Sequence, residues 1–132
     1  MKLIPLKMFR KIQKLIPILC VDSIMLNSKG EIYLKKRWHP PYKGKYSIVG
    51  GRIFRGESPI EALKRHITEE SGLRIQKIKF INYIDWGFMG RCQYTFSLVF
   101  MVLVKGEPKE GRFFKDIPGT IDRASLKLIR EI

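Results

Sequence analysis

The stretch Gly50–Leu73, GGRIFRGESPIEALKRHITEESGL, concentrates acidic residues in a chain that has few of them. The whole sequence has 132 residues, with 26 Lys and Arg against 12 Asp and Glu. Four of those acids lie in this one stretch: Glu57, Glu61, Glu69 and Glu70. The local structure that the stretch encodes gives a physical reason for gathering them.

Sequence signals mark both ends of a helix within the stretch. Ser58, Pro59 and Glu61 form a capping box with proline at the first helical position, and Gly72 stands where a C′ glycine ends a helix. We therefore predict a helix over residues 59–71. Its apolar stripe is expected to pack on the rest of the domain: Ile60, Leu63 and Ile67. The neighbouring stripe faces elsewhere and holds Ala62, His66, Glu69 and Glu70.

Glu69 and Glu70 lie near the C-terminus of this helix, where negative charge opposes the helix dipole. Solvated surface charge is the plain interpretation of such a pair. The alternative is a divalent cation that compensates both carboxylates. Mg²⁺ accepts hard carboxylate oxygens and needs few protein ligands, because it keeps water and phosphate oxygens in its coordination shell. A magnesium site would explain why acids gather in a basic protein.

Apolar and β-branched patterning predicts further elements along the chain. We expect helices at 6–15 and 123–132, and strands at 18–26, 31–35, 46–49, 75–84 and 94–104. The first two strands form a hairpin, and the last is apolar enough for the centre of a sheet. The helix at 6–15 is basic and amphipathic, and we expect it to pack on the domain, with a membrane-surface role as the alternative. Residues 1–132 are expected to form one domain.

Composition limits the cellular setting and the kind of partner. A net charge of +14 predicts attraction to polyanions without choosing among nucleic acid, anionic membrane and phosphorylated small molecules. Cys20 and Cys92 lie in apolar runs without metal-ligand spacing, so we expect two reduced thiols in a cytoplasmic protein. Lys and Arg are scattered through residues 2–14 and leave no clean apolar h-region, so we do not expect a secretory signal there. The longest uncharged run, 92–104, is shorter than the roughly 20 residues of a spanning helix.

The stretch Gly51–Leu73 resembles the Nudix box, G-x5-E-x7-R-E-U-x-E-E-x-G-U, in which U is aliphatic. Eight of the nine fixed positions match without a gap: Gly51, Glu57, Arg65, Ile67, Glu69, Glu70, Gly72 and Leu73. The resemblance implies an α/β fold, an α/β/α sandwich with a mixed β-sheet and the Nudix loop-helix-loop. It also implies a metal-dependent hydrolase of a nucleoside diphosphate linked to another group.

The resemblance further implies roles for the matching positions. The backbone carbonyl of Gly50 and the carboxylates of Glu69 and Glu70 would bind Mg²⁺ or Mn²⁺, with Glu70 among the catalytic groups. Glu57 would support the metal site, and Arg65 would pair with a glutamate to hold it in place. A metal that bridges a diphosphate neutralises charge and orients an attacking water, so the physical argument agrees with the implied roles.

The ninth position departs from the pattern, because His66 stands where the box has Glu, in many members the catalytic base or a metal ligand. A neutral imidazole, with a reference pKa of about 6.5, can take a proton near pH 7, so His66 is one candidate base. Alternatively His66 only pairs with a glutamate one turn further on, and the base lies elsewhere or has been lost. Four other acids could supply it but are expected to be surface charges: Asp85, Glu107, Glu110 and Asp116.

Within the family, the sequence is most similar to GDP-mannose mannosyl hydrolases, which also lack that Glu and cleave a C–O bond. The likeness rests on Pro17, Asp22, Asn27-Ser28, Gly30-Glu31, Lys36-Arg37, Pro40, Gly44, Gly50-Gly51-Arg52 and Glu70-Ser71-Gly72-Leu73-Arg74. It implies that Asp22 and Arg37 line the sugar or nucleotide site and that Arg52 stabilises the departing diphosphate, for which a guanidinium fork is suited. Those enzymes use a histidine base in the C-terminal third, where this chain has no histidine.

We therefore expect a phosphorylated small-molecule substrate, such as GDP-mannose or a nucleoside triphosphate. Nucleic acid is the second partner class, a membrane partner is not expected, and homodimer formation is left open. Tyr42, Tyr46 and Trp86 are candidates for stacking on a base, beneath a loop that begins at Trp38. The alternative function is a catalytically weak Nudix fold that binds a nucleotide or RNA, favoured by the net charge and by His66.

Overall fold

The computed structural model describes residues 3–40, 42–89 and 93–131. Within them the chain forms three helices and seven strands, in the order α1 (Leu6–Leu15), β1 (Ile18–Leu26), β2 (Ile32–Lys36), β3 (Tyr46–Ser47), β4 (Val49–Arg52), α2 (Pro59–Ser71), β5 (Arg74–Met89), β6 (Gln93–Lys105), β7 (Arg112–Phe114) and α3 (Arg123–Arg130). Cys92 and Ile132, which the sequence analysis included, lie outside the described residues.

The strands form one mixed sheet in the order β3-β2-β1-β6-β5, with β4 also paired to β1 and β7 to β2. Strands β1 and β6 run parallel, in a register that begins at Ile18 and Thr95 and ends at Leu26 and Leu103. The other described pairs are antiparallel. Strand β6 therefore lies between two partners, as its almost continuous apolar run predicted.

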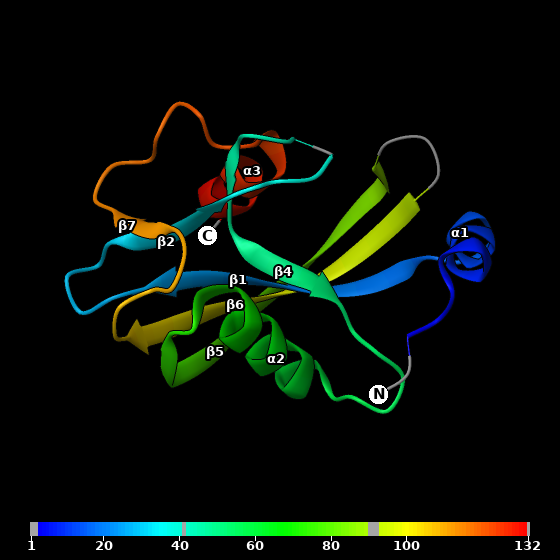
Figure 1. Ribbon diagram of the computed structural model, residues 1–132, viewed down its shortest axis with the longest axis horizontal. Coiled ribbons are helices and arrows are strands. Elements are labelled where there is room, and N and C mark those ends of the chain that lie inside the picture. Colours follow the sequence, from blue (N-terminus) through cyan, green and yellow to red (C-terminus); the bar gives the residue numbers. More distant parts are fainter. Residues whose placement is uncertain (1–2, 41, 90–92, 132) are drawn as a thin grey trace.

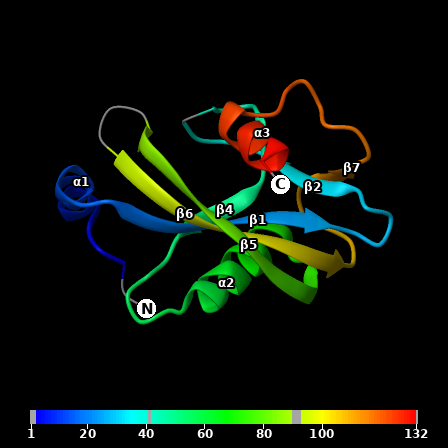
Figure 2. The same cartoon turned by 180° about the vertical axis from the view of Figure 1, so that it is seen from behind.

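Helices α2 and α3 lie on opposite faces of this sheet, while α1 stands at one end of it, beside the start of β1 (Figures 1 and 2). The face under α2 buries a core that includes Val21, Leu63, Ile67 and Val102. The face under α3 packs Ile24, Leu34, Val99, Ile121 and Leu128. The predicted α/β/α sandwich with a mixed sheet is confirmed.

Helix α2 has the predicted bounds because both of its ends are fixed locally. The Ser58 hydroxyl accepts a hydrogen bond from the Glu61 N–H at 3.1 Å, and Gly72 ends the helix in the left-handed conformation at φ 69°. Its buried residues are Ala62, Leu63, Ile67 and Ser71. The prediction that Ile60 packs on the domain was wrong, since Ile60 is 37% exposed. It lies in the first turn, and apolar burial begins with the residues that follow.

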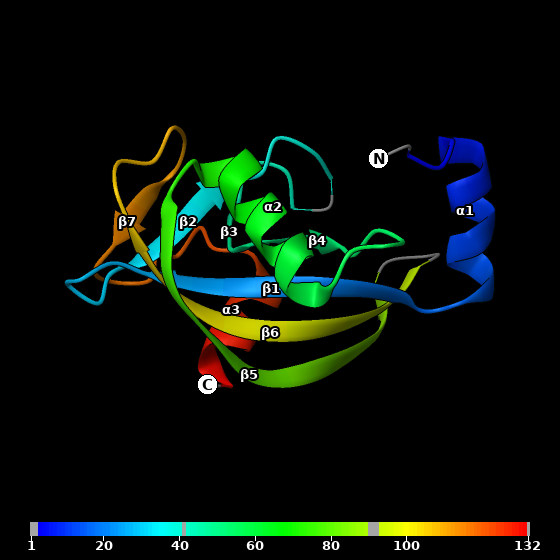
Figure 3. The same cartoon turned by 90° about the horizontal axis from the view of Figure 1, so that it is seen from below.

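Helix α1 also has its predicted bounds, and it packs on the domain through one side only: none of its residues is fully buried, but the helix contacts β6 and Phe9 contacts Arg52. Figure 3 shows it at one end of the sheet, away from α2. Strand β7 was not predicted, since three residues carry no readable periodicity.

None of the described helices is long and apolar enough to cross a membrane. Cys20 is a buried free thiol whose pKa burial raises to about 12.

Candidate active site

The candidate site is built around strand β4, because the glycines of this strand allow two side chains to approach the backbone closely. A Cβ on Gly50 would stand 2.2 Å from Oδ1 of Asp22, and a Cβ on Gly51 would stand 2.4 Å from Cε1 of His66. Side-chain carbon atoms do not approach other atoms this closely, so a side chain at Gly50 would clash with β1, and one at Gly51 would have to displace the His66 ring. The glycine pair thus brings a carboxylate from β1 and an imidazole from α2 to the same short strand.

Arg65 holds Glu57 through two hydrogen bonds in a fork. Its Nε donates to Oε2 at 2.7 Å and its Nη2 donates to Oε1 at 3.0 Å, while Glu57 also accepts from the Phe54 N–H at 2.8 Å. These bonds to Arg65 lower the pKa of Glu57 to about 2. The guanidinium also lies 3.8 Å from the centre of the Phe54 ring and donates to the carbonyl of Arg52 at 3.1 Å. The glutamate that pairs with Arg65 is therefore Glu57.

His66 lies between the β4 backbone and Glu70. Its Nε2 is 2.9 Å from the carbonyl oxygen of Arg52, and its Nδ1 is 3.7 Å from Oε2 of Glu70. Because a carbonyl only accepts, Nε2 carries the hydrogen, and Nδ1 is the nitrogen left to take a proton. Burial alone would lower the pKa of His66, but Glu70 and the Arg52 carbonyl outweigh it and raise the pKa above its ordinary value.

The carboxylates of Glu69 and Glu70 are held only by long contacts. Glu69 is 63% exposed, with Oε2 3.8 Å from Nη1 of Arg65. Glu70 places Oε1 3.9 Å from Nζ of Lys35, and the same Nζ is 3.6 Å from Oε2 of Glu110. Lys35 thus supplies part of the positive charge that two acids at a helix C-terminus need. None of these contacts is short enough to occupy the carboxylate lone pairs fully.

These residues fit a magnesium ion in number and in chemistry. Among the described residues, no three His, Cys, Asp or Glu side chains come together as a complete protein cage for a metal. What α2 offers is the carboxylates of two consecutive residues, Glu69 and Glu70. Mg²⁺ is commonly held by one or two carboxylates while waters and substrate phosphates complete its octahedron. The donor set suits Mg²⁺ or Mn²⁺ better than softer metals.

A cavity of about 490 Å³ opens on the other side of β4. The three residues that the sequence assigned to substrate all line it: Asp22, Arg37 and Arg52. Tyr42 and Trp86 line it as well. Tyr46 instead packs edge-on against Phe114, with ring centres 5.0 Å apart.

The cavity has a polar wall that the sequence analysis missed, made by Thr95, Ser97, Asp122 and Ser125. Asp122 caps α3, where its Oδ1 accepts from the Ser125 N–H at 2.7 Å and its Oδ2 from the Ser125 hydroxyl at 3.1 Å. The spacing of Asp122 and Ser125 before an apolar-periodic segment signals a helix cap. Nothing in that spacing shows that the cap faces a cavity.

Asp22 is a buried carboxyl group in the cavity wall. Burial raises its pKa to about 6, partly offset by a hydrogen bond from Ser97. Ser97 in turn accepts from the indole N–H of Trp86 at 3.1 Å. Trp86, Ser97 and Asp22 therefore form a chain of hydrogen bonds along the wall. A carboxylate in this position accepts hydrogen bonds from the amino or hydroxyl groups of a ligand.

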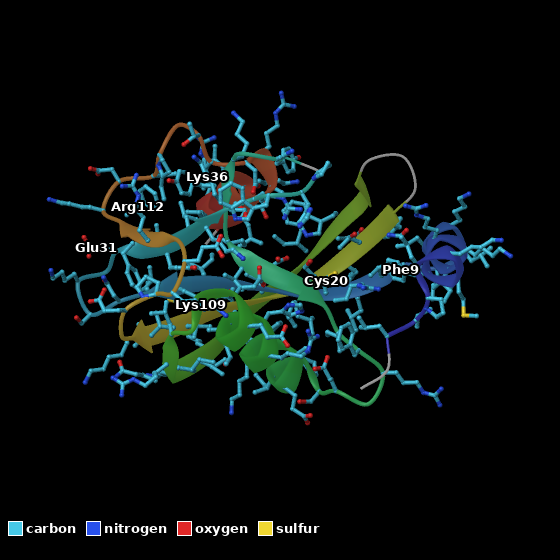
Figure 4. The ribbon with its side chains drawn as sticks, viewed as in Figure 1. Phe9, Cys20, Glu31, Lys36, Lys109 and Arg112 are labelled. Atoms are coloured by element: carbon cyan, nitrogen blue, oxygen red, sulfur yellow. The ribbon has the colours of Figure 1, made fainter. Side chains whose placement is uncertain are left out.

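Helix α1 closes one end of the cavity through Leu6 and Phe9. The guanidinium of Arg52 lies 3.8 Å from the centre of the Phe9 ring, a cation–π contact. In Figure 4, Phe9 lies on the side of α1 that faces the body of the protein. The arginine expected to contact phosphate is thus covered on one face by an aromatic ring.

The other candidate bases have structural contacts or lie in solvent. Asp85 accepts from the Tyr94 hydroxyl at 2.7 Å and from the Gly87 N–H at 2.9 Å. Glu110 accepts from the indole N–H of Trp38 at 2.5 Å, which joins two loops far apart in the chain. Glu107 and Asp116 are exposed.

The fold is an α/β/α sandwich in which a glycine-rich strand and the following helix bring together an Arg–Glu pair and two consecutive glutamates, beside a cavity with one polar wall. This is the architecture of a Nudix hydrolase. The NUDIX domain model matches residues 17–128, and the chain belongs to that family.

Two curated relatives share part of the sequence. An ADP-ribose pyrophosphatase of Methanocaldococcus jannaschii is 41% identical over 63 residues, which are 48% of this chain and 36% of the relative. The NAD-capped RNA hydrolase NudC of Haemophilus influenzae is 31% identical over 75 residues, which are 54% of this chain and 28% of the relative. The chain thus spans about a third of these relatives. Neither is named as a GDP-mannose hydrolase, so the family is confirmed and the subgroup is not.

Three solved structures share the fold at 14–20% identity. The MutT NUDIX hydrolase of Burkholderia pseudomallei has a TM-score of 0.78, covering 89% of this chain and 98% of that one. The NUDIX domain of Shewanella oneidensis NrtR with ADP ribose has a TM-score of 0.71, covering 88% and 86%. The Francisella tularensis NMN adenylyltransferase/ADP ribose pyrophosphatase with AMP and a Mn ion also has 0.71, covering 95% and 43%.

Proposed function

We propose that this protein is a divalent-metal-dependent hydrolase of a nucleoside diphosphate linked to a second group, such as ADP-ribose or another nucleotide sugar. One observation carries the proposal: acids that fit Mg²⁺ lie on one side of β4, and a cavity with a polar wall opens on the other. A diphosphate that crosses β4 would meet both. The names of the two relatives, one acting on ADP-ribose and one on NAD-capped RNA, support the same substrate class.

The proposed roles follow from position. Glu69, Glu70 and the carbonyl of Gly50 would hold the metal, which when bound neutralises diphosphate charge and activates water. Arg65 keeps Glu57 ionised and fixed, so that α2 and the preceding loop keep their relative placement. Arg52 would bind the departing diphosphate, which requires its guanidinium to turn part of its surface from Phe9 to phosphate.

The cavity would select the nucleoside part of the substrate. Arg37 would contact its phosphate or sugar, and Asp22 and Asp122 would accept hydrogen bonds from hydroxyl or amino groups. Tyr42 and Trp86 offer aromatic faces to a base. Donor groups on both the base and the ribose make adenosine and guanosine diphosphates suitable ligands. GDP-mannose remains within this class.

His66 is the proposed general base, acting through Nδ1, because Nε2 already donates to the Arg52 carbonyl. Glu70 faces the same nitrogen and would stabilise the imidazolium that forms. This arrangement places the base one helical turn from the metal-binding carboxylates. It also explains how the chain could work with histidine at a position where the box has glutamate.

The test is hydrolysis of ADP-ribose, NAD, GDP-mannose and nucleoside triphosphates with Mg²⁺, with Mn²⁺ and with EDTA. We expect turnover that requires metal and falls at least 100-fold in Glu69→Gln plus Glu70→Gln. Glu61→Gln is the matched control, since Glu61 is an exposed acid in the first turn of the same helix. Full activity in EDTA, or equal loss in the control, would contradict the proposal.

A second candidate is a nucleotide- or RNA-binding module without turnover, favoured by the engagement of His66 with backbone and Glu70. Calorimetry distinguishes the two. Metal-dependent binding of ADP-ribose without product would support a small-molecule binding module. RNA affinity that falls steeply with salt and is unchanged by the Glu69 and Glu70 variants would indicate a nucleic-acid binder.

A further inference from the structure

Helix α1 is amphipathic, but the structure leaves its apolar face largely uncovered. At about 100° per residue, one half of the helix carries Leu6, Met8, Phe9, Ile12 and Leu15. The opposite side carries Lys7, Arg10, Lys11 and Lys14. Phe9 contacts Arg52, but Leu6 is 62%, Met8 55% and Leu15 79% exposed.

The residues on either side of α1 extend this apolar surface. Leu3, Ile4, Ile16 and Leu19 are between 45% and 61% exposed. We call these four, together with Leu6, Met8 and Leu15, the N-terminal apolar patch. Among the described residues, seven of the thirteen exposed large hydrophobic side chains belong to it. Such clustering differs from the scattered apolar exposure that a protein surface normally has.

The helix itself needs a partner surface. It has ten residues, its N-cap is Pro5 without a side-chain hydrogen bond, and no side chain on it is buried. Helices shorter than about 12 residues are marginal in water unless an apolar face packs on something. A cation–π contact between Phe9 and Arg52 fixes the inner side of α1 and leaves Met8 and Leu15 facing outward.

The partner must accept apolar and cationic side chains together. From Leu3 to Val21 the chain has no acidic residue. A second copy would bring another chain with a net charge of +14 against this basic helix, which is electrostatically unfavourable. An anionic bilayer offers hydrocarbon at the depth of Met8 and Leu15, and phosphate at the level of the lysines. The charge therefore selects a lipid surface over self-association.

We propose that α1 and the N-terminal apolar patch dock this protein onto an anionic lipid bilayer surface, with the helix lying in the interface. This revises the expectation that the protein has no membrane partner. Because Leu6 and Phe9 also line the cavity, the docked helix places the cavity entrance next to the lipid headgroups.

The test is co-sedimentation of the full chain with vesicles of phosphatidylcholine alone and of phosphatidylcholine with phosphatidylglycerol. Wild type is expected to sediment with the anionic vesicles and to remain in solution with the neutral ones. Met8→Glu plus Leu15→Glu should weaken anionic-vesicle binding at least tenfold. Leu103→Glu plus Ile117→Glu is the matched control, since it adds equal charge at positions that are 38% and 39% exposed elsewhere, and it should bind like wild type.

A Leu15→Trp variant reports insertion directly, because indole fluorescence shifts to shorter wavelength when the side chain enters the acyl region. The shift should occur with anionic vesicles only. Binding by wild type that survives Met8→Glu plus Leu15→Glu would show electrostatic adsorption alone and overturn the proposal. A lipid-free dimer by light scattering that the same pair of substitutions dissociates would assign the patch to a second copy and overturn it as well. Neither result depends on hydrolytic activity.

Discussion

The imidazole of His66 lies directly on the backbone of Gly51, with Cε1 2.4 Å from where a Cβ would be. Gly51 is on β4 and His66 is on α2, so this contact sets how closely the helix approaches the strand. The same ring touches the Arg52 carbonyl and faces Glu70. One glycine therefore determines the placement of a proposed base and of a proposed metal ligand.

We expect Gly51→Ala to reduce activity at least tenfold while the protein remains folded, because the methyl group must displace the His66 ring. Steady-state kinetics and circular dichroism measure the two effects. Gly119→Ala is the matched control, since a Cβ there meets no atom within 4 Å. In a His66→Ala background the clash is absent, so Gly51→Ala should add little further destabilisation. If Gly51→Ala destabilises the wild-type protein and the His66→Ala variant equally, this account is contradicted.

Arg65→Lys should weaken metal binding about 10- to 100-fold, although the charge is kept. Lysine cannot reproduce the fork that holds both oxygens of Glu57, nor the contact with the Phe54 ring. The measurement is the Mn²⁺ dissociation constant by calorimetry. Arg74→Lys, at an exposed arginine outside the site, should leave it unchanged. If both variants bind Mn²⁺ like wild type, the Arg65–Glu57 pair has no role in the metal site.

Asp22→Asn should stabilise the protein above pH 6 and have little effect near pH 4. Burial raises the pKa of Asp22 to about 6, so between about pH 4 and 6 the folded state binds more protons than the unfolded state. Stability is therefore lost as pH rises through this window, and the loss stays at its full value above it. The difference between the folded and unfolded pKa values of Asp22 corresponds to a change of at most about 3 kcal/mol in the free energy of unfolding. Urea unfolding in EDTA at both pH values measures the effect.

The control for that experiment is Asp116→Asn, at an exposed carboxylate away from the cavity. This control substitution should have the same small effect on the free energy of unfolding at both pH values. If Asp22→Asn raises the free energy of unfolding by the same amount at low and high pH, the stabilisation comes from packing rather than from ionisation.

Tyr42→Gly should raise the free energy of unfolding by about 1 kcal/mol while weakening nucleotide binding several-fold. Tyr42 has φ 62°, a conformation that bulky side chains rarely adopt, and it lines the cavity. Glycine removes the backbone strain together with the aromatic face. Thermal unfolding and ADP-ribose calorimetry measure the two changes. Tyr42→Asn, which also tolerates this conformation, should behave similarly; lower stability with unchanged affinity would contradict the interpretation.

Features fixed by neighbouring residues were predictable from the sequence. The bounds of α2 follow from Ser58 and Gly72, which act within a few residues of the helix they end. The bounds of α1 follow from apolar periodicity and Pro17. The prediction that Ile60 is buried failed because periodicity gives the direction of a side chain but does not say where along the helix the sheet begins.

Features made by distant residues were not predictable in detail. Arg65 and Glu57 are eight positions apart, and their pairing was implied by a motif. Trp38 and Glu110 are 72 positions apart, and their hydrogen bond depends on how two loops meet. The polar cavity wall similarly joins the beginning of β6 to the cap of α3. No local pattern in either segment shows that Ser97 and Asp122 face the same space.

The parallel pairing of β1 with β6 has a consequence for the order of folding. Ile18 pairs with Thr95 and Cys20 with Ser97, so the sheet centre forms only after most of the chain has been made. Such long-range parallel contacts form late, because a long loop must close before any of them is gained. Asp22 and Ser97 therefore face one another only in the assembled sheet. During synthesis, a chain that has not yet reached β6 lacks one wall of the cavity and cannot form it.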